Sequence, residues 1–111
     1  MPETYKILGQ VAATANTTHN VYTVPAGTQT VVSSIIITNR NNNANIVYRI
    51  AAQPAGVTLA NQHFIAYDSG VTSLDSVALS LGVTLGNTDI LSVSTSNSNV
   101  SFSVFGIEIT P

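Results

Sequence analysis

The sequence predicts an all-β protein, an antiparallel β-sandwich of about eight strands that is either jelly-roll-like or immunoglobulin-like. Val, Ile and Thr dominate the apolar and half-polar positions, and these β-branched residues suit a pleated sheet better than a helix. No stretch sustains the 3.6-residue apolar repeat of an amphipathic helix. Groups of Pro, Gly, Asn and Ser recur at short intervals, as turns do between short antiparallel strands.

The turn residues divide the chain into candidate strands. Turns are expected at residues 25–27, 41–43, 54–56, 69–70, 86–87 and 96–99. Strands are expected at residues 5–11, 20–24, 28–39, 45–52, 62–67, 73–80, 89–94 and 100–109, with 83–85 as a candidate for a further short strand. Residues 1–111 are expected to form a single β-sandwich domain, in which residues 1–12 are an N-terminal arm or an edge strand.

The strand expected at residues 28–39 has apolar side chains on both faces. Val31, Ile35 and Ile37 fall on one face, whereas Val32 and Ile36 fall on the other. Both faces therefore need cover. Two interpretations follow: a central strand that lies beneath a loop, or a strand whose outer face meets another subunit.

The last expected strand changes its alternation near its middle. Val100, Phe102 and Val104 alternate in one register, whereas Ile107 and Ile109 alternate in the opposite one. An extra residue at positions 105–106, a β-bulge in which glycine supplies the unusual dihedral angles, would keep all five side chains facing inward. We therefore expect a bulge at Phe105-Gly106.

The composition argues against several classes of function for this chain. The net charge is −2, and the basic residues are only Lys6, Arg40 and Arg49, too few for counterion release along a nucleic acid or for a polybasic membrane contact. Without cysteine there is no disulfide framework, thiolate metal site or thiol nucleophile. No apolar run approaches the roughly 20 residues of a membrane span, and no secretory signal is visible, so synthesis in a cytoplasm is expected.

The scarcity of charge favours a protein that works through contacts with other proteins. Charged residues make up 7% of the chain, against about 25% in an average globular domain. Ser, Thr and Asn take their place. Hydroxyls and amides lose less free energy than ammonium or carboxylate groups when an interface removes their water.

No catalytic, cofactor-binding or metal-binding residue is predicted. His19 and His63 are far apart, each lacks a second ligand nearby, and His63 is expected to be a hydrogen-bonded packing residue. Asp68, Asp75 and Asp89 each lie beside turn residues, where capping is a commoner role than calcium binding. Nothing resembles a nucleophile elbow, a Gly-rich phosphate loop or a zinc-binding helix, so an enzyme is not expected.

Arg49 and the tyrosines are the remaining candidates for recognition. Arg49 lies on the outward face of its strand and is expected to meet solvent, a partner carboxylate or a neighbouring subunit. Carbohydrate sites usually present exposed aromatic rings, a role open to Tyr5, Tyr22, Tyr48 and Tyr67. The chain has no Trp, and tyrosines in strands serve equally often in packing.

A series of short segments spans nearly the whole chain. In order they are residues 5–10 (YKILGQ), 21–27 (VYTVPAG), 32–35 (VSSI), 38–40 (TNR), 48–50 (YRI), 61–68 (NQHFIAYD), 82–85 (GVTL) and 100–109 (VSFSVFGIEI). The series resembles a family of small β-sandwich virion structural proteins of tailed bacteriophages, of the cyanophage and marine-phage type. The resemblance implies a structural protein of the virion, made in the host cytoplasm, with no catalytic residues.

The resemblance implies one of two roles in the virion, and a third interpretation rests on the tyrosines. The leading expectation is a capsid decoration or cement protein, a homotrimer that bridges and stabilises neighbouring subunits of the major capsid protein. The alternative is a tail, baseplate or fibre-attachment component that contacts a neighbouring tail or fibre protein. A more distant alternative is a module that binds host glycans. In the first role, many weak contacts on several subunits would combine into lasting attachment.

Overall fold

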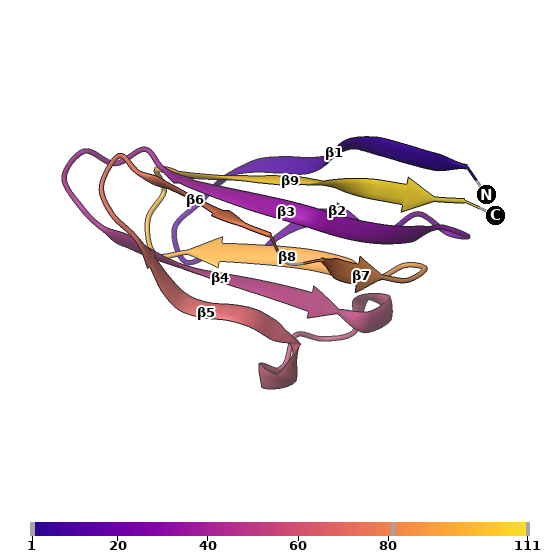
Figure 1. Cartoon of the computed structure of the whole chain (residues 1–111). Helices are drawn as coiled ribbons and strands as arrows, with labels where there is room; N and C mark the ends of the chain where they lie inside the picture. Colours follow the sequence, from indigo (N-terminus) through magenta and orange to yellow (C-terminus); the bar gives the residue numbers. More distant parts are fainter. Residues whose placement is uncertain (1, 81, 111) are drawn as a thin grey trace.

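The computed structural model describes residues 2–80 and 82–110, which form two antiparallel sheets packed face to face (Figure 1). The strands are β1 (Glu3–Ala13), β2 (His19–Thr23), β3 (Gln29–Asn39), β4 (Ile46–Gln53), β5 (Phe64–Val71), β6 (Ser76–Leu79), β7 (Val83–Leu85), β8 (Ile90–Thr95) and β9 (Val100–Ile109), and two 3-10 turns, η1 (Pro54–Gly56) and η2 (Asn61–His63), lie between β4 and β5. Sheet A has the order β1-β9-β3-β6, with β7 also paired to β3. Sheet B has the order β2-β8-β4-β5.

The strand pairing is nested, so each pair encloses the next along the chain. The outermost pair is β1 with β9, followed by β2 with β8, β3 with β6 and β7, and finally the local hairpin of β4 with β5. This is the pairing of a jelly roll. The predicted all-β sandwich is therefore confirmed, and the jelly-roll form is the one observed. Both termini lie at the same end of the sandwich (Figure 1), where the Thr110 N–H donates to the Pro2 carbonyl oxygen at 3.1 Å.

The core lies between the sheets and consists of aliphatic and aromatic side chains. Tyr48 of sheet B meets Phe102 of sheet A edge to face, with 6.4 Å between the ring centroids, a favoured geometry for aromatic pairs. Around them pack Val32, Ile35, Ile37, Ile50, Leu91, Val93 and Val104, which are almost fully buried. Burial of these side chains supplies most of the driving force for folding, because the chain has no disulfide.

A bulge in β3 separates the apolar residues that the sequence placed on two faces. The pairing of β3 with β9 shifts by one residue at Ser33, between Val32 and Ser34. The extra residue lets Val32 and Ile35 both face the core, where their exposure is 0%. Val31 and Ile36 face outward and are half-buried. The prediction that Val31 shares a face with Ile35 was wrong, because simple alternation does not allow for a bulge.

The prediction of a bulge in β9 was also wrong, because β9 itself pairs without an extra residue. The extra residues lie in its two neighbours, at Leu8 of β1 and at Ser33 of β3. Alternation along β9 is therefore unbroken, and Ile107 and Ile109 face away from Phe102 toward the outside of sheet A.

Gly106 lies next to these two bulges and is required there by close packing. It pairs with Lys6 on one side and with Val32 on the other. A Cβ atom at this position would overlap the carbonyl oxygen of Val31 and lie 2.9 Å from Leu8 Cδ1. Glycine thus leaves room for the side chain of the bulged Leu8, and it does so without adopting a positive φ.

The turn predicted at residues 69–70 is instead part of β5. Ser69 pairs with Tyr48, Gly70 with Val47, and the following Val71 pairs with Ile46. Val71 is 2% exposed, so burial of its side chain in the core keeps the strand extended past the glycine.

The segment of residues 54–63 covers one end of the outer face of sheet B. Gln53 holds the backbone of this segment in place, because its Nε2 donates to the Val57 carbonyl oxygen at 2.8 Å. Gln53 also accepts a hydrogen bond from the Ser92 hydroxyl, and both side chains are buried. The other end of this outer face stays open.

We expect Gly106→Ala to lower the free energy of unfolding by about 1–3 kcal/mol, the usual cost of overpacking. The added methyl group must displace either the β3 backbone at Val31 or the Leu8 side chain. Gly70→Ala is the matched control, because a Cβ there meets only the Ile46 carbonyl oxygen, at 3.8 Å. Urea unfolding of the two variants measures the difference, and equal stability would contradict the packing described at Gly106.

Candidate interaction surface

The outer face of sheet A carries a group of apolar side chains, which we call the apolar face. Cross-strand neighbours point to the same side of a sheet, and the register joins Tyr5 to Ile107 to Val31 across three strands. The members of the apolar face are Tyr5, Ile7, Val31, Ile36, Phe105, Ile107 and Ile109. Tyr5 and Ile7 are the most open, at 74% and 52% exposure. The others are half-buried.

Tyr5 and Ile7 lie on an edge strand that is long. β1 has 11 residues, and no strand within residues 2–80 and 82–110 pairs with its far side in sheet A. The other edges are shorter: β2 has 5 residues, β6 has 4, β7 has 3 and β5 has 8, and both β1 (at Leu8) and β5 shift register against their neighbours. Short edges discourage pairing with another chain, whereas a long edge with apolar side chains favours it. β1 is thus the edge best suited to a protein contact.

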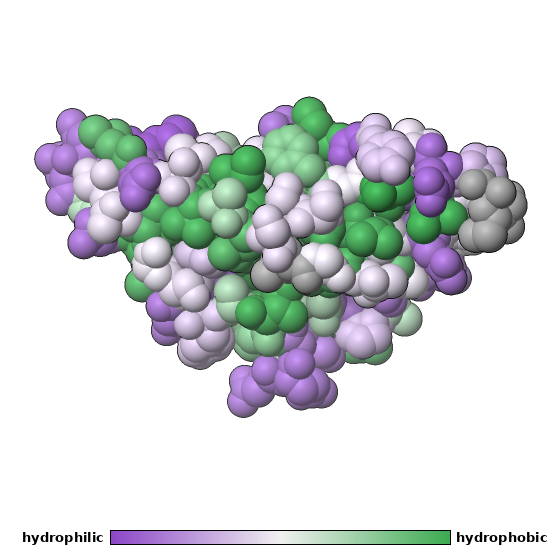
Figure 2. All heavy atoms as spheres, in the orientation of Figure 1, coloured by the Kyte–Doolittle hydropathy of each residue, from purple (hydrophilic) through white to green (hydrophobic). Residues whose placement is uncertain are grey.

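Apolar side chains also reach the surface at the opposite edge of sheet A. Figure 2 shows hydrophobic residues across the middle of the molecule, at the height of β6 and β7 in Figure 1, and hydrophilic residues toward its ends. Val77, Leu79 and Val83 on these two strands pack against the core but are only partly buried. The molecule therefore presents much apolar and little charged surface.

A hydrogen-bonded group at the end of the sandwich fixes the strands beneath the apolar face. The Tyr22 hydroxyl donates to Glu108 Oε2 at 2.6 Å and lies 2.8 Å from the Thr30 hydroxyl. Lys6 Nζ donates to Glu108 Oε1 at 3.2 Å. Burial, reinforced by Glu108, raises the pKa of Tyr22 to about 12. The hydrogen bond from Tyr22, reinforced by Lys6, lowers the pKa of Glu108 despite its partial burial.

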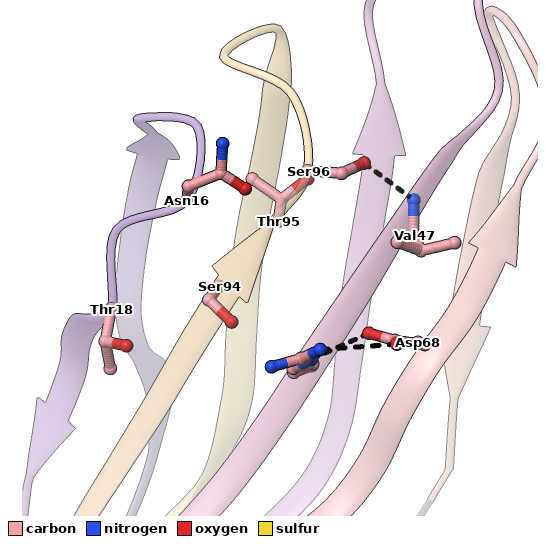
Figure 3. Close-up of a pocket in the computed structure, with 8 residues that line it drawn as sticks. Asn16, Thr18, Val47, Asp68, Ser94, Thr95 and Ser96 are labelled. Carbon is pink, nitrogen blue, oxygen red and sulfur yellow. Dashed lines mark hydrogen bonds and ion pairs between the residues drawn. The ribbon is translucent and has the colours of Figure 1, made fainter.

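The open end of sheet B holds a polar depression of about 320 Å³, drawn in Figure 3. Its lining residues are Asn16, Thr18, Val47, Arg49, Asp68, Ser94, Thr95 and Ser96. Arg49 Nε donates to Asp68 Oδ1 at 2.6 Å, and its Nη2 donates to Oδ2 at 3.3 Å. Arg49 was expected to meet solvent, a partner carboxylate or a neighbouring subunit, and in the structure its partner is the carboxylate of Asp68 in the same chain.

The residues considered for chemistry in the sequence lie far apart or have structural roles. His63 is buried, and its Nδ1 accepts from the Ala60 N–H at 3.0 Å, which confirms its expected packing role. Asp75 and Asp89 cap turns as expected: Asp75 accepts from the Ser76 N–H, and Asp89 from the Gly86 N–H. Among residues 2–80 and 82–110, no group of three or more His, Cys, Asp or Glu could hold a metal ion.

The ion pair between Arg49 and Asp68 was missed in the sequence. Asp68 was expected only to cap a turn, and 19 residues separate the two partners. One signal in the sequence could have revealed the bulge that forms this pair. Asp is depleted in regular strands, so an aspartate inside a segment that continues as a strand indicates a bulge. Of the four tyrosines, Tyr22 and Tyr48 are buried, whereas Tyr5 and Tyr67 remain exposed.

Comparison with known proteins identifies the fold but no family. No protein-family model matches the sequence, and neither does any curated protein. In the structure of the T13 particle of infectious bursal disease virus, a chain matches 96% of this protein with a TM-score of 0.55 and 13% identity. A chain from the Gx strain of that virus matches 96% with a TM-score of 0.54 and 12% identity. These likenesses show a shared fold.

A third match is a pentameric capsid protein isolated from metagenomic phage sequences, with a TM-score of 0.42, 19% identity and 96% of this chain covered. The protein spans 30% and 32% of the two matched chains of infectious bursal disease virus and 64% of the phage capsid protein. Within the described residues, no helix is long and apolar enough to cross a membrane.

We expect the stability of the protein to fall at acidic pH through Glu108. Its pKa is lower in the folded state than its ordinary value of 4.5. The ionised carboxylate therefore stabilises the fold above about pH 4.5, and this contribution is lost as the pH falls through the folded pKa. Glu108→Gln should lower the free energy of unfolding at pH 7 by about 1–2 kcal/mol and flatten its decline below pH 4.5.

Urea unfolding between pH 3 and pH 7 measures both effects. Glu3→Gln is the matched control, because Glu3 is exposed on the same pair of strands. A Glu108→Gln variant with the wild-type pH profile would contradict the role given to the Tyr22 hydrogen bond.

Proposed function

We propose that the protein is a non-enzymatic structural protein of a tailed-phage virion, a capsid decoration or cement protein whose apolar face contacts both other copies of the protein and neighbouring major capsid subunits. The observation that carries the proposal is the exposure of Tyr5 and Ile7 beside Phe105 and Ile107 on the outer face of sheet A. Burying a large apolar side chain contributes about 1.5–3 kcal/mol. A soluble monomer gains nothing from leaving several such side chains in water.

The composition supports a contact that is spread over a wide surface. Because only 7% of the residues are charged, few ionic groups lose their water when the surface is covered. The jelly-roll pairing agrees with this role, since the fold occurs among viral capsid proteins, and the two matched chains come from structures of infectious bursal disease virus, one of them of its T13 particle. The sequence resemblance to small phage virion proteins points the same way.

In this proposed role the protein acts as a homotrimer. Tyr5 and Ile7 on the edge strand β1 contact the other copies, and the half-buried side chains of β9 and β3 contact the shell. Each copy then binds weakly, but three linked copies raise the effective concentration of the remaining contacts. Binding to the finished shell and not to separated capsid subunits stabilises the shell by mass action.

We expect Ile7→Asp to convert the trimer into a monomer with little change in melting temperature. Ile7 is 52% exposed, so an aspartate there remains hydrated in the monomer, whereas it would be an uncompensated charge inside the contact. Ile65→Asp is the matched control, an isoleucine 43% exposed on the edge strand of sheet B. Light scattering coupled to gel filtration measures the mass. A wild-type protein that is monomeric both in solution and in the particle excludes the trimer.

We expect particles that lack the protein to assemble but to release their DNA at a lower temperature or after milder osmotic shock. Particles reconstituted with Ile7→Asp should behave like particles without the protein, and those with Ile65→Asp like the wild type. Heat-induced DNA release measures shell stability, and adsorption to host cells is measured in parallel. Heads of normal stability with defective adsorption would reject the cement role in favour of the tail, baseplate or fibre-attachment role.

A further inference from the structure

A bulge in β5 places two residues opposite Arg49. Tyr48 of β4 pairs with Ser69, but Ile50, two residues on, pairs with Ala66, so Tyr67 and Asp68 together face the single residue between them. Asp68 has a φ of 53°, a left-handed conformation that is uncommon for residues other than glycine. Bulges of this kind redirect side chains and occur frequently beside functional sites.

The redirected side chains hold the guanidinium of Arg49 from two directions. The carboxylate of Asp68 accepts both Nε–H and Nη2–H, which fixes the plane of the guanidinium. Arg49 Cζ lies 4.0 Å from the centroid of the Tyr67 ring, within the range of a cation–π contact. Phe64 supports that ring edge to face, with 4.9 Å between centroids. The guanidinium is therefore ordered before any ligand arrives.

The stability of the fold does not explain this arrangement. Both partners of the ion pair are well exposed, with 39% and 46% of their side-chain surface in solvent, and exposed pairs contribute little because water screens them. The left-handed backbone at Asp68 works against stability. A strained residue that supports a weak surface pair is the kind of outlier from which a binding role is inferred.

We propose that the polar depression on sheet B binds a neutral saccharide, with Arg49 and Asp68 as the residues that recognise adjacent hydroxyl groups. The depression measures about 320 Å³, at the small end of the roughly 300–1,000 Å³ found for ligand sites. Its size therefore suits one sugar ring of a longer glycan.

The donors and acceptors in the depression match those of a sugar. Each hydroxyl of a saccharide can donate and accept, so a neighbouring pair can donate to the Asp68 carboxylate and accept from the remaining N–H groups of Arg49. Thr18 and Ser94 add hydroxyls, and Asn16 adds an amide (Figure 3). Val47 supplies an apolar contact for the C–H groups of the ring.

The charge of the depression favours a neutral ligand over an anion. Asp68 neutralises Arg49, and the other lining residues carry no charge. The depression therefore has little positive potential to attract a phosphate or a carboxylate ligand, because the carboxylate of Asp68 lies 2.6 Å from Arg49 Nε. The site lies on the outer face of sheet B, opposite the apolar face, so it does not depend on the proposed shell contact.

The experiment is a titration of the isotope-labelled protein, followed by amide and arginine Nε–H NMR shifts. The probes are the methyl glycosides of mannose, galactose and glucose at high millimolar concentration, with inorganic phosphate as a separate probe. We expect at least one glycoside to shift the Arg49 Nε–H signal and the amides of Asp68, Ser94 and Ser96. No shift at these groups with any of the three glycosides overturns the proposal. A response to phosphate without a response to any glycoside also overturns it.

Two substitutions test the roles of the paired side chains. Arg49→Lys keeps the charge but loses the planar fork, and Asp68→Asn removes the charged acceptor; each should weaken binding of the active glycoside by about tenfold or more. Arg40→Lys is the matched control, since Arg40 Nε donates to Ser101 Oγ away from the depression, and its affinity should equal that of the wild type. Wild-type affinity in both site variants overturns the proposal. The mapped shifts of the wild-type protein decide the question if either variant fails to fold.

Discussion

Two bulges on either side of β9 determine which side chains of sheet A face the core and which face outward. Leu8 in β1 and Ser33 in β3 are the extra residues, and they lie on either side of the position of Phe105. They let the inward rows of all three strands stay in phase, with the bulged Leu8 packed in the space left by the glycine. The same shift leaves Ile107 and Val31 on the outer side. The apolar face therefore follows from the way the core is packed.

The two outer faces of the sandwich differ in chemistry. Sheet A is open outside and carries the apolar face, with the exposed Glu3 at its rim and with Lys6 and Glu108 paired at the same end. Sheet B is covered at one end by residues 54–63 and carries hydroxyls, an amide and a neutralised ion pair at the other. A molecule of this kind can attach through one face and keep the other in contact with solvent. The sandwich provides this separation because the core lies between the faces.

Much of the fold could be predicted from the sequence, because its signals are local. β-branched residues and turn residues repeat along the chain, so the all-β class and most strand positions follow from short windows. The bulges could not be predicted, since a bulge is defined by the pairing of two strands that are distant in sequence. The apolar residue Val31 was therefore assigned to the wrong face. Gly70 was assigned to a turn because its pairing with Val47 depends on a partner that no local window contains.

The order of the strands along the chain has a consequence for the kinetics of folding. Among the described strands β9 is synthesised after all the others, yet it lies between β1 and β3 and pairs with both, from Glu3 opposite Ile109 onward. During synthesis β1 therefore has no partner in the sheet, and one side of β3 stays unpaired, until β9 has left the ribosome. Such long-range pairing is slow and leaves strand edges exposed to aggregation. The apolar run Ile35–Ile37 of β3 therefore stays open along one side of its strand until β9 is available to pair with it.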